Sequence, residues 1–83
     1  MNKNSVTVIL KIPSLKIKKE IEIQNNMPVN ELAKAIVFSF FDNVEEKEEN
    51  YYLKCENPIA LLRGNKTIFE YGLHNGSIIE CDR

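Results

Sequence analysis

The sequence contains no long hydrophobic run. Its longest apolar stretch, Ala35–Phe41, is interrupted by Ser39 and is far shorter than the roughly 20 residues that a membrane-spanning helix needs. The polar segment Met1–Ser5 leads into alternating apolar and polar residues, which is not the pattern of a secretory signal peptide. Asn2 excludes N-myristoylation, and the position of Cys81 excludes a prenylation box. We therefore expect a soluble protein with a cytoplasmic location.

The sequence also lacks an excess of charge of either sign. Eleven basic and twelve acidic side chains give a net charge of −1, whereas general nucleic-acid binding needs an excess of Lys and Arg. The 83 residues suffice for one domain, residues 1–83, with a modest core and no deep cleft. We therefore predict a single globular domain that binds no nucleic acid.

Side chains that commonly carry chemistry are scarce. Cys55 and Cys81 lack the close spacing of metal or redox motifs, and we interpret them as small buried hydrophobic residues. A disulfide between them would require a compartment that is not reducing. The single histidine, His74, lies in a turn sequence where exposure to solvent is the commoner case, and nothing places it beside a nucleophile. We expect no enzymatic activity, no cofactor and no metal site.

Two strands are predicted near the N-terminus. Residues 6–12 and 17–23 each alternate between apolar and polar side chains, which is the period of a half-buried strand. Pro13–Lys16 supplies turn chemistry between them, so the two strands should form a hairpin.

A helical periodicity follows Met27-Pro28. The apolar residues that share one face of the expected helix, Val29–Phe41, are Val29, Leu32, Ala33, Ile36 and Phe40. Pro28 suits a helix start because its missing N–H would be unpaired there. The acidic stretch 42–50 is interpreted as a solvated loop.

Three further strands are predicted in the second half of the chain. They cover Tyr51–Glu56, Ile59–Leu62 and Ser77–Asp82, and Asn57-Pro58 turns the chain between the first two.

A capping-box sequence precedes the last strand. Thr67 and Glu70 have the spacing at which each side chain bonds the other residue's backbone N–H, which predicts a short helix. Gly72 suits its left-handed C-terminal position, with Leu73 as the hydrophobic contact behind it. Asn75-Gly76 is a tight-turn pair.

The resulting order, β-β-α-β-β-short helix-β, predicts an α+β fold. A mixed five-strand sheet should carry one helix packed across one face. The predicted core comprises Val6, Val8, Leu10, Ile21, Ile23, Leu32, Ile36, Phe40, Leu53, Leu62, Leu73 and Ile79.

This succession resembles the ubiquitin-like β-grasp fold. The most specific stretch is Thr67–Ser77, which is similar to the family's pattern of Thr or Ser, an apolar residue, an acid, Tyr, Leu or Ile, and a turn into the last strand. The resemblance extends from Val6 to Cys81 and is carried by pattern more than by identity.

Within that superfamily, the chain looks most like the YukD/EsaB-type proteins of Gram-positive type VII secretion systems. The segments that carry this resemblance are Met27–Val29, Asn57–Leu62 and Gly72–Ile78. It implies a bacterial, cytoplasmic accessory or regulatory component that binds a membrane component or ATPase of the WXG100/ESX-like secretion system.

Two features distinguish the sequence from ubiquitin. The segment Ile79–Arg83 lacks the Gly-Gly that conjugation and sulfur carriage require, so we expect no conjugation. On the predicted outer face of the sheet, charged residues replace most of the apolar patch that ubiquitin receptors bind. A protein modifier or sulfur carrier, and an adaptor of another pathway, remain the alternative functions.

Two surfaces are candidates for partner binding. On the helix, Phe38 falls opposite the core and Phe41 off its edge. Alternatively, Phe41 tucks under the acidic loop, and Tyr51 or a second copy covers Phe38; for Phe41 we favour this second interpretation. The sheet face contributes Tyr52, Lys54, Ile78 and Glu80. The predicted hairpin contains Lys11, Lys16, Lys18 and Lys19, and its charge is opposite in sign to that of the acidic loop. The two regions are either simply solvated or attract each other between copies, so we expect a monomer or a weak homodimer.

Overall fold

The computed structural model describes residues 4–41, 51–56 and 59–83 of the chain. In chain order, its elements are β1 (Ser5–Ile12), the 3-10 turn η1 (Pro13–Leu15), β2 (Ile17–Gln24), α1 (Val29–Phe40), β3 (Tyr52–Glu56), β4 (Ala60–Leu61) and β5 (Ile78–Asp82). The predicted acidic loop 42–50 and the Asn57-Pro58 turn lie outside the described residues.

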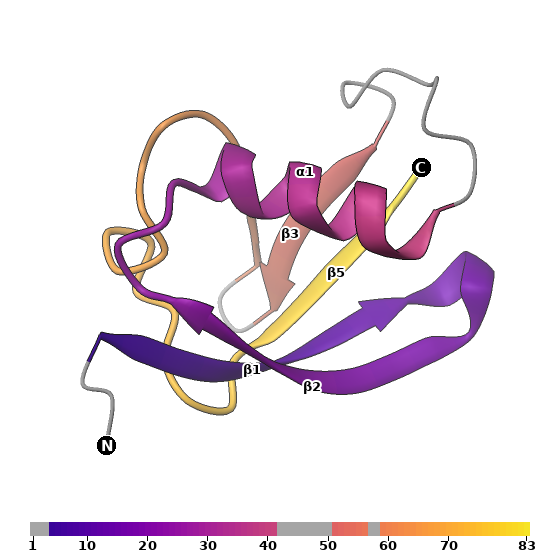
Figure 1. The fold of residues 1–83 in the computed structure, drawn as a ribbon, viewed down its shortest axis with the longest axis horizontal. Helices are drawn as coiled ribbons and strands as arrows, with labels where there is room; N and C mark the ends of the chain where they lie inside the picture. Colours follow the sequence, from indigo (N-terminus) through magenta and orange to yellow (C-terminus); the bar gives the residue numbers. More distant parts are fainter. Residues whose placement is uncertain (1–3, 42–50, 57–58) are drawn as a thin grey trace.

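The five strands form one mixed sheet in the order β2-β1-β5-β3-β4. The two strands that pair in parallel, β1 and β5, lie at its centre, and the other neighbouring strands pair antiparallel. Helix α1 crosses one face of this sheet (Figure 1). The α+β fold predicted from the sequence is confirmed.

The strand bounds differ slightly from the predicted ones. β3 and β5 each begin one residue later than expected, and β4 covers Ala60–Leu61 instead of Ile59–Leu62. The chain nevertheless continues along β3, since the N–H of Leu62 donates to the carbonyl of Leu53 at 2.7 Å.

The β1–β2 hairpin turns through η1. Pro13 occupies its first position, and the N–H of Lys16 donates to the Pro13 carbonyl at 3.1 Å. Lys16 takes the left-handed conformation with φ of 56°, which ends the turn and directs the chain back into β2.

Helix α1 begins directly after Pro28. Pro28 is extended, and its carbonyl accepts the N–H groups of Glu31 and Leu32. The helix ends at Phe40, one residue before the predicted end, because Phe41 returns to an extended conformation (φ −106°, ψ 137°). Within the described ranges, no helix is long and apolar enough to span a membrane.

The hydrophobic core lies between α1 and the inner face of the sheet. Its buried members are Val8, Leu10, Ile12, Ile23, Val29, Leu32, Ile36, Val37, Phe41, Leu53, Cys55, Leu62, Ile68, Leu73, Ile79 and Cys81. Three residues of the predicted core, Val6, Ile21 and Phe40, are half-buried instead. They lie near the start of β1, on the edge strand β2 and at the last position of α1, where fewer neighbours cover them.

The capping box predicted at Thr67 forms, but the short helix does not. The N–H of Glu70 donates to the Thr67 hydroxyl at 3.1 Å, and the N–H of Thr67 donates to the Glu70 carboxylate at 2.8 Å. These backbone and side-chain hydrogen bonds from Thr67 lower the pKa of the Glu70 carboxyl. The prediction of a capping box at Thr67 and Glu70 is therefore confirmed, and the prediction of a short helix after it is wrong.

The helix is absent because its stop signal occupies the same turn. Gly72, with φ of 80°, donates to the Phe69 carbonyl at 2.9 Å, and Leu73 donates to the Ile68 carbonyl at 3.2 Å, which is the Schellman pattern of a helix end. Ile68 and Leu73, the hydrophobic pair that accompanies this pattern, are both buried in the core. The result is a single capped turn anchored by Ile68.

A matched pair of substitutions tests this anchor. Ile68→Ala should lower the free energy of unfolding by about 2–5 kcal/mol, because it leaves a cavity in the core. Phe69→Ala changes the next residue, which is 71% exposed, and should cost about 0.5 kcal/mol or less. Urea unfolding followed by circular dichroism measures both, and similar losses would contradict the anchoring role of Ile68.

Candidate functional site

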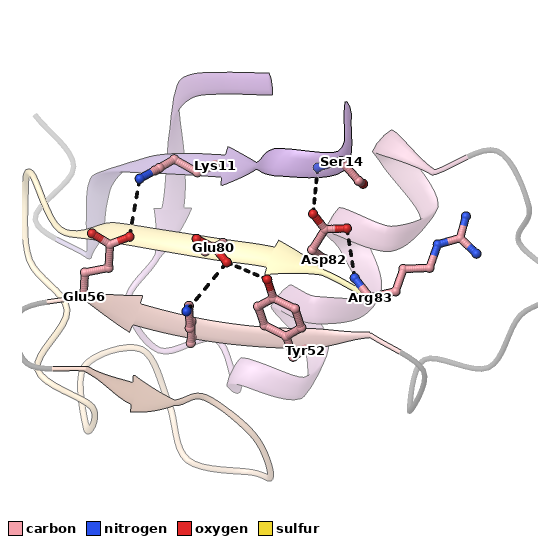
Figure 2. Close-up of polar contacts among 8 residues, drawn as sticks. Lys11, Ser14, Tyr52, Glu56, Glu80, Asp82 and Arg83 are labelled. Atoms are coloured by element: carbon pink, nitrogen blue, oxygen red, sulfur yellow. Dashed lines mark hydrogen bonds and ion pairs between the residues drawn. The ribbon is translucent and has the colours of Figure 1, made fainter. Parts of the chain in front are cut away.

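The register of β3 and β5 brings four of the six predicted partner-binding residues together. Lys54 lies directly opposite Glu80, while Tyr52 and Ile78 occupy the same face of the sheet, two positions along their strands. This face, which we call the outer face, is the one that α1 does not cover (Figures 1 and 2).

The two phenylalanines predicted as partner-binding residues do not belong to the outer face. Phe38 lies on the solvent side of α1 and is 58% exposed. Phe41 is only 5% exposed, and its ring packs edge-on against Tyr51 with the centroids 4.7 Å apart. Phe41 is therefore a core residue that packs against Tyr51, while Phe38 is exposed; whether the acidic loop 42–50 covers Phe41 lies outside the described residues.

A polar cluster occupies the centre of the outer face. The hydroxyl of Tyr52 donates to Oε2 of Glu80 at 2.5 Å, and Nζ of Lys54 lies 3.7 Å from the same oxygen (Figure 2). Nζ of Lys54 is also 5.8 Å from the centroid of the Tyr52 ring. The hydrogen bond to Glu80 raises the pKa of Tyr52 to about 12, because ionising the phenol would remove the donor and place a second anion beside the carboxylate.

A second ion pair crosses the outer face over β5. Nζ of Lys11, on β1, lies 3.4 Å from the carboxylate of Glu56, on β3 (Figure 2). An ion pair this exposed to water stabilises the fold by less than about 1 kcal/mol. Its main effect is to pair opposite charges on this face.

Apolar side chains flank these charges. Ile9 lies directly beside Ile78 in the β1–β5 pair, and both are half-buried. Leu61 lies beside Lys54 in the β3–β4 pair and is 54% exposed. Ile9 and Leu61 are not among the partner-binding residues predicted from the sequence. The signal for Ile9 was an apolar residue at an outward position of the first strand, but its neighbour depends on the pairing of distant strands.

Asp82 fixes the end of β5. Its carboxylate is buried and accepts the N–H of Ser14 at 2.7 Å and that of Arg83 at 2.9 Å (Figure 2). Burial alone would raise the pKa of Asp82, but these hydrogen bonds and the charge of Arg83 outweigh it and lower the pKa. The guanidinium of Arg83 lies 5.6 Å from the Tyr51 ring and 5.9 Å from that of Phe41.

The two cysteines are buried on the inner face of the sheet. Burial raises the pKa of Cys81 to about 12, so this thiol stays protonated near neutral pH and is a poor nucleophile. His74 is exposed, as expected, and its Nδ1 lies 2.9 Å from the carbonyl of Asn75. In the part of the chain that the structure describes, no three His, Cys, Asp or Glu side chains are grouped to hold a metal ion.

Comparison with known proteins gives similarity in structure alone. No protein-family model and no curated protein match the chain. The C-terminal ubiquitin-like domain of mouse tubulin-specific chaperone e matches with a TM-score of 0.76 and 13% identity, over 95% of this chain and 86% of that one. A ubiquitin-like domain from tubulin-binding cofactor B matches with a TM-score of 0.75 and 12% identity, over 95% and 89%.

A chain of a toluene 4-monooxygenase complex also matches, with a TM-score of 0.72 and 15% identity, over 94% of this chain and 96% of that one. Because all three identities are low, the matches show the architecture and not a shared activity. The chain has the ubiquitin-like fold that its sequence predicted.

The Tyr52–Glu80 hydrogen bond can be tested by titration. Glu80→Gln removes the neighbouring charge and should bring the pKa of Tyr52 from about 12 back toward about 10. NMR of protein labelled with carbon-13 at the tyrosine ring measures the shift. Glu56→Gln, whose carboxylate pairs with Lys11, should leave the pKa of Tyr52 unchanged, and a similar fall in both variants would contradict a specific bond.

The contribution of Asp82 to stability should depend on pH. Asp82→Asn should lower the free energy of unfolding by about 1–2 kcal/mol near neutral pH, because hydrogen bonds to a charged acceptor are stronger. Since the folded pKa of Asp82 is lowered, this contribution is present above the unfolded value of about 3.9 and is lost as the pH falls through the folded value. Urea unfolding at several pH values should show the two proteins converging below about pH 4; a constant gap would contradict this.

Proposed function

We propose that this chain is a non-catalytic ubiquitin-like module that binds another protein through the outer face of β5, β3 and β4. The observation that carries the proposal is the composition of that face. Exposed Leu61 and the half-buried pair Ile9 and Ile78 flank a polar cluster of Tyr52, Lys54 and Glu80. Protein-interaction sites combine partly exposed apolar side chains with oriented polar groups, and this face offers both.

The polar cluster also favours selectivity for particular partners. Tyr52 and Lys54 already contact Glu80, so the geometry of these groups is fixed before binding, which lowers the entropic cost of association. A receptor evolved for an apolar patch would have to desolvate these charges without offering matching groups. We therefore propose that ordinary ubiquitin receptors are not its partners.

The proposed partner is a membrane component or ATPase of a type VII secretion system. The support is the sequence resemblance to the YukD/EsaB-type proteins, carried by segments that include Met27–Val29 and Gly72–Ile78. Ubiquitin-like domains of a tubulin-specific chaperone and of a tubulin-binding cofactor share the fold, which agrees with a binding module. The match to a chain of a toluene 4-monooxygenase complex favours a second candidate, in which this chain is a subunit of an enzyme complex. The crosslinking experiment described below distinguishes this candidate from a role in secretion.

We further propose that the module acts without being conjugated. Activation of a ubiquitin-type modifier needs a flexible segment after the last strand. Here the buried carboxylate of Asp82 bonds the N–H of Ser14, and Arg83 lies over the rings of Phe41 and Tyr51. These contacts hold Asp82 and Arg83 against the body of the domain.

Site-specific photo-crosslinking in the native host tests these proposals. A photoreactive phenylalanine analogue at Leu61 should give an adduct with one partner protein, identified by mass spectrometry. The same analogue at Phe69, which lies in the turn at 67–72 and is 71% exposed against 54% for Leu61, is the control and should give none. Lys54→Ala should reduce the Leu61 adduct without changing the urea unfolding midpoint by more than a small amount, since Lys54 is partly exposed.

The possible outcomes separate the proposals. Equal adducts from positions 61 and 69, or none from 61, would contradict binding through the outer face. An adduct with a partner outside type VII secretion would retain the interaction module and overturn the pathway. Intact-mass analysis of this protein in the same cells tests the alternative that it is a protein modifier. A ladder of covalent conjugates would overturn the proposal that the module acts without being conjugated.

A further inference from the structure

Strand β2 (Ile17–Gln24) presents an open backbone edge. It is the terminal strand of the sheet and pairs with β1 alone among the described strands. The N–H of Asn25 donates to the carbonyl of Asn4 at 2.7 Å, so alternate residues from Asn25 back along β2 bond to β1. The intervening residues Lys18, Glu20 and Glu22 therefore direct their N–H and C=O groups away from the sheet.

The bonding pattern of β1 supports the same assignment. The N–H of Ile9 donates to the carbonyl of Ser77, and the carbonyl of Thr7 accepts the N–H of Gly76, both at 2.8 Å. The odd-numbered residues of β1 thus bond towards β5, which leaves the even-numbered ones to bond β2. The free groups on β2 follow from this alternation.

Charged side chains line this edge in an unusual order. Charges on an edge strand commonly prevent pairing with other chains. Along the outer side of this edge the sign changes once, from Lys16 and Lys18 to Glu20 and Glu22, and all four residues are exposed. Such an order is self-complementary when the strand meets an antiparallel copy of itself.

We propose that two copies of this chain associate through their β2 edges, antiparallel about a two-fold axis at Lys19. In this register Lys18 lies opposite Glu20 of the second copy, and Glu20 opposite its Lys18. Lys16 and Glu22 continue the pairing just beyond. On the inner side, half-buried Ile17 and Ile21 lie opposite each other. The two sheets would become one continuous sheet across an isologous interface.

Other registers pair less well. Moving the axis to Glu20 places that residue against itself, and moving it to Ile21 places Glu20 against Glu22. Like charges directly opposite on paired strands are destabilising. In the proposed register the pair of like charges is Lys19 opposite Lys19 of the second copy. Nζ of Lys19 lies 5.5 Å from the ring centroid of Phe40, in helix α1 of the same chain.

The surroundings of the edge suit a second copy. A groove of about 440 Å³ lies between β2 and α1, lined by apolar and small side chains that include Ile21, Ile23, Ala35 and Ser39. The two-fold axis would bring both grooves to the same side of the joined sheet, next to the interface. Pairing through β2 also leaves the outer face around Lys54 and Leu61 open, since that region lies across the sheet, so this inference is independent of the proposed function.

Charge exchange tests the register. Sedimentation of the wild-type chain at rising concentration should show the average mass increasing from 9.6 kDa towards twice that value, less so at high salt because exposed charge pairs are screened. Lys18→Glu and Glu20→Lys alone should each weaken association roughly tenfold, because each turns both central pairs into like charges. The double variant, and an equimolar mixture of the two single variants, should associate as the wild type does.

Controls and amide exchange complete the test. Lys34→Glu changes an exposed charge on the side of α1 that faces β3 and should leave association unchanged. Hydrogen exchange at Lys18, Glu20 and Glu22 should slow with concentration, while exchange at Ile21 and Ile23, already bonded to β1, should change little. A wild-type chain that stays at 9.6 kDa, or a double variant that fails to recover association while remaining folded by circular dichroism, would overturn the proposal.

Discussion

The parallel pairing of β1 with β5 is the interaction on which the rest of the structure depends. It joins the first and last strands at the centre of the sheet, with Leu10 beside Ile79, and both side chains are fully buried. The turn before β5 sets the register, because the N–H of Thr7 bonds the side chain of Asn75 at 2.8 Å and its carbonyl accepts the Gly76 N–H. The positive φ of Gly76 allows this turn with no steric cost.

Everything on the outer face follows from that register. A shift by one residue would exchange the inner and outer sides of β5. Glu80 would then enter the core, and Ile79 would face solvent. The cluster of Tyr52, Lys54 and Glu80 therefore exists because the core positions on β5 hold it there. The hydrogen bonds and ion pairs of the cluster fix side-chain orientation and add little to the stability of the fold.

The sequence was sufficient to predict the five strands, helix α1 and their order. The hairpin, α1 and the capped turn all depend on neighbours within a few residues, and those are the signals that local periodicity and capping residues contain. The length of the turn at Thr67 was missed because the start and stop signals were each interpreted separately. Seen together, Thr67 and Gly72 leave space for one turn only.

The surface was harder to predict for two reasons. Projection along a helical wheel assumed that Phe41 continues α1, but the extended backbone at Phe41 breaks that phase and carries its ring to Tyr51. The neighbours of Ile9 and Leu61 depend on pairing between strands far apart in the chain, which alternation within one strand does not contain. Inward or outward direction along the strands was therefore predicted well, and so was the grouping of residues from β3 and β5 on one face, whereas the neighbours Ile9 and Leu61 were missed.

The central position of β5 also determines how the domain can be assembled during synthesis. Until residue 82 has left the ribosome, the β1–β2 hairpin and the β3–β4 pair have no strand between them, since β5 separates them in the sheet. A chain without β5 therefore has two partial sheets. Leu10 on β1 and Leu53 on β3 lack the strand that separates them in the folded domain. Closing the sheet brings together residues almost the whole chain apart, a long-range step that is slow compared with forming a helix or a hairpin. The domain is therefore completed only when β5 is available, and until then the inner face of the sheet is most open to chaperones and proteases.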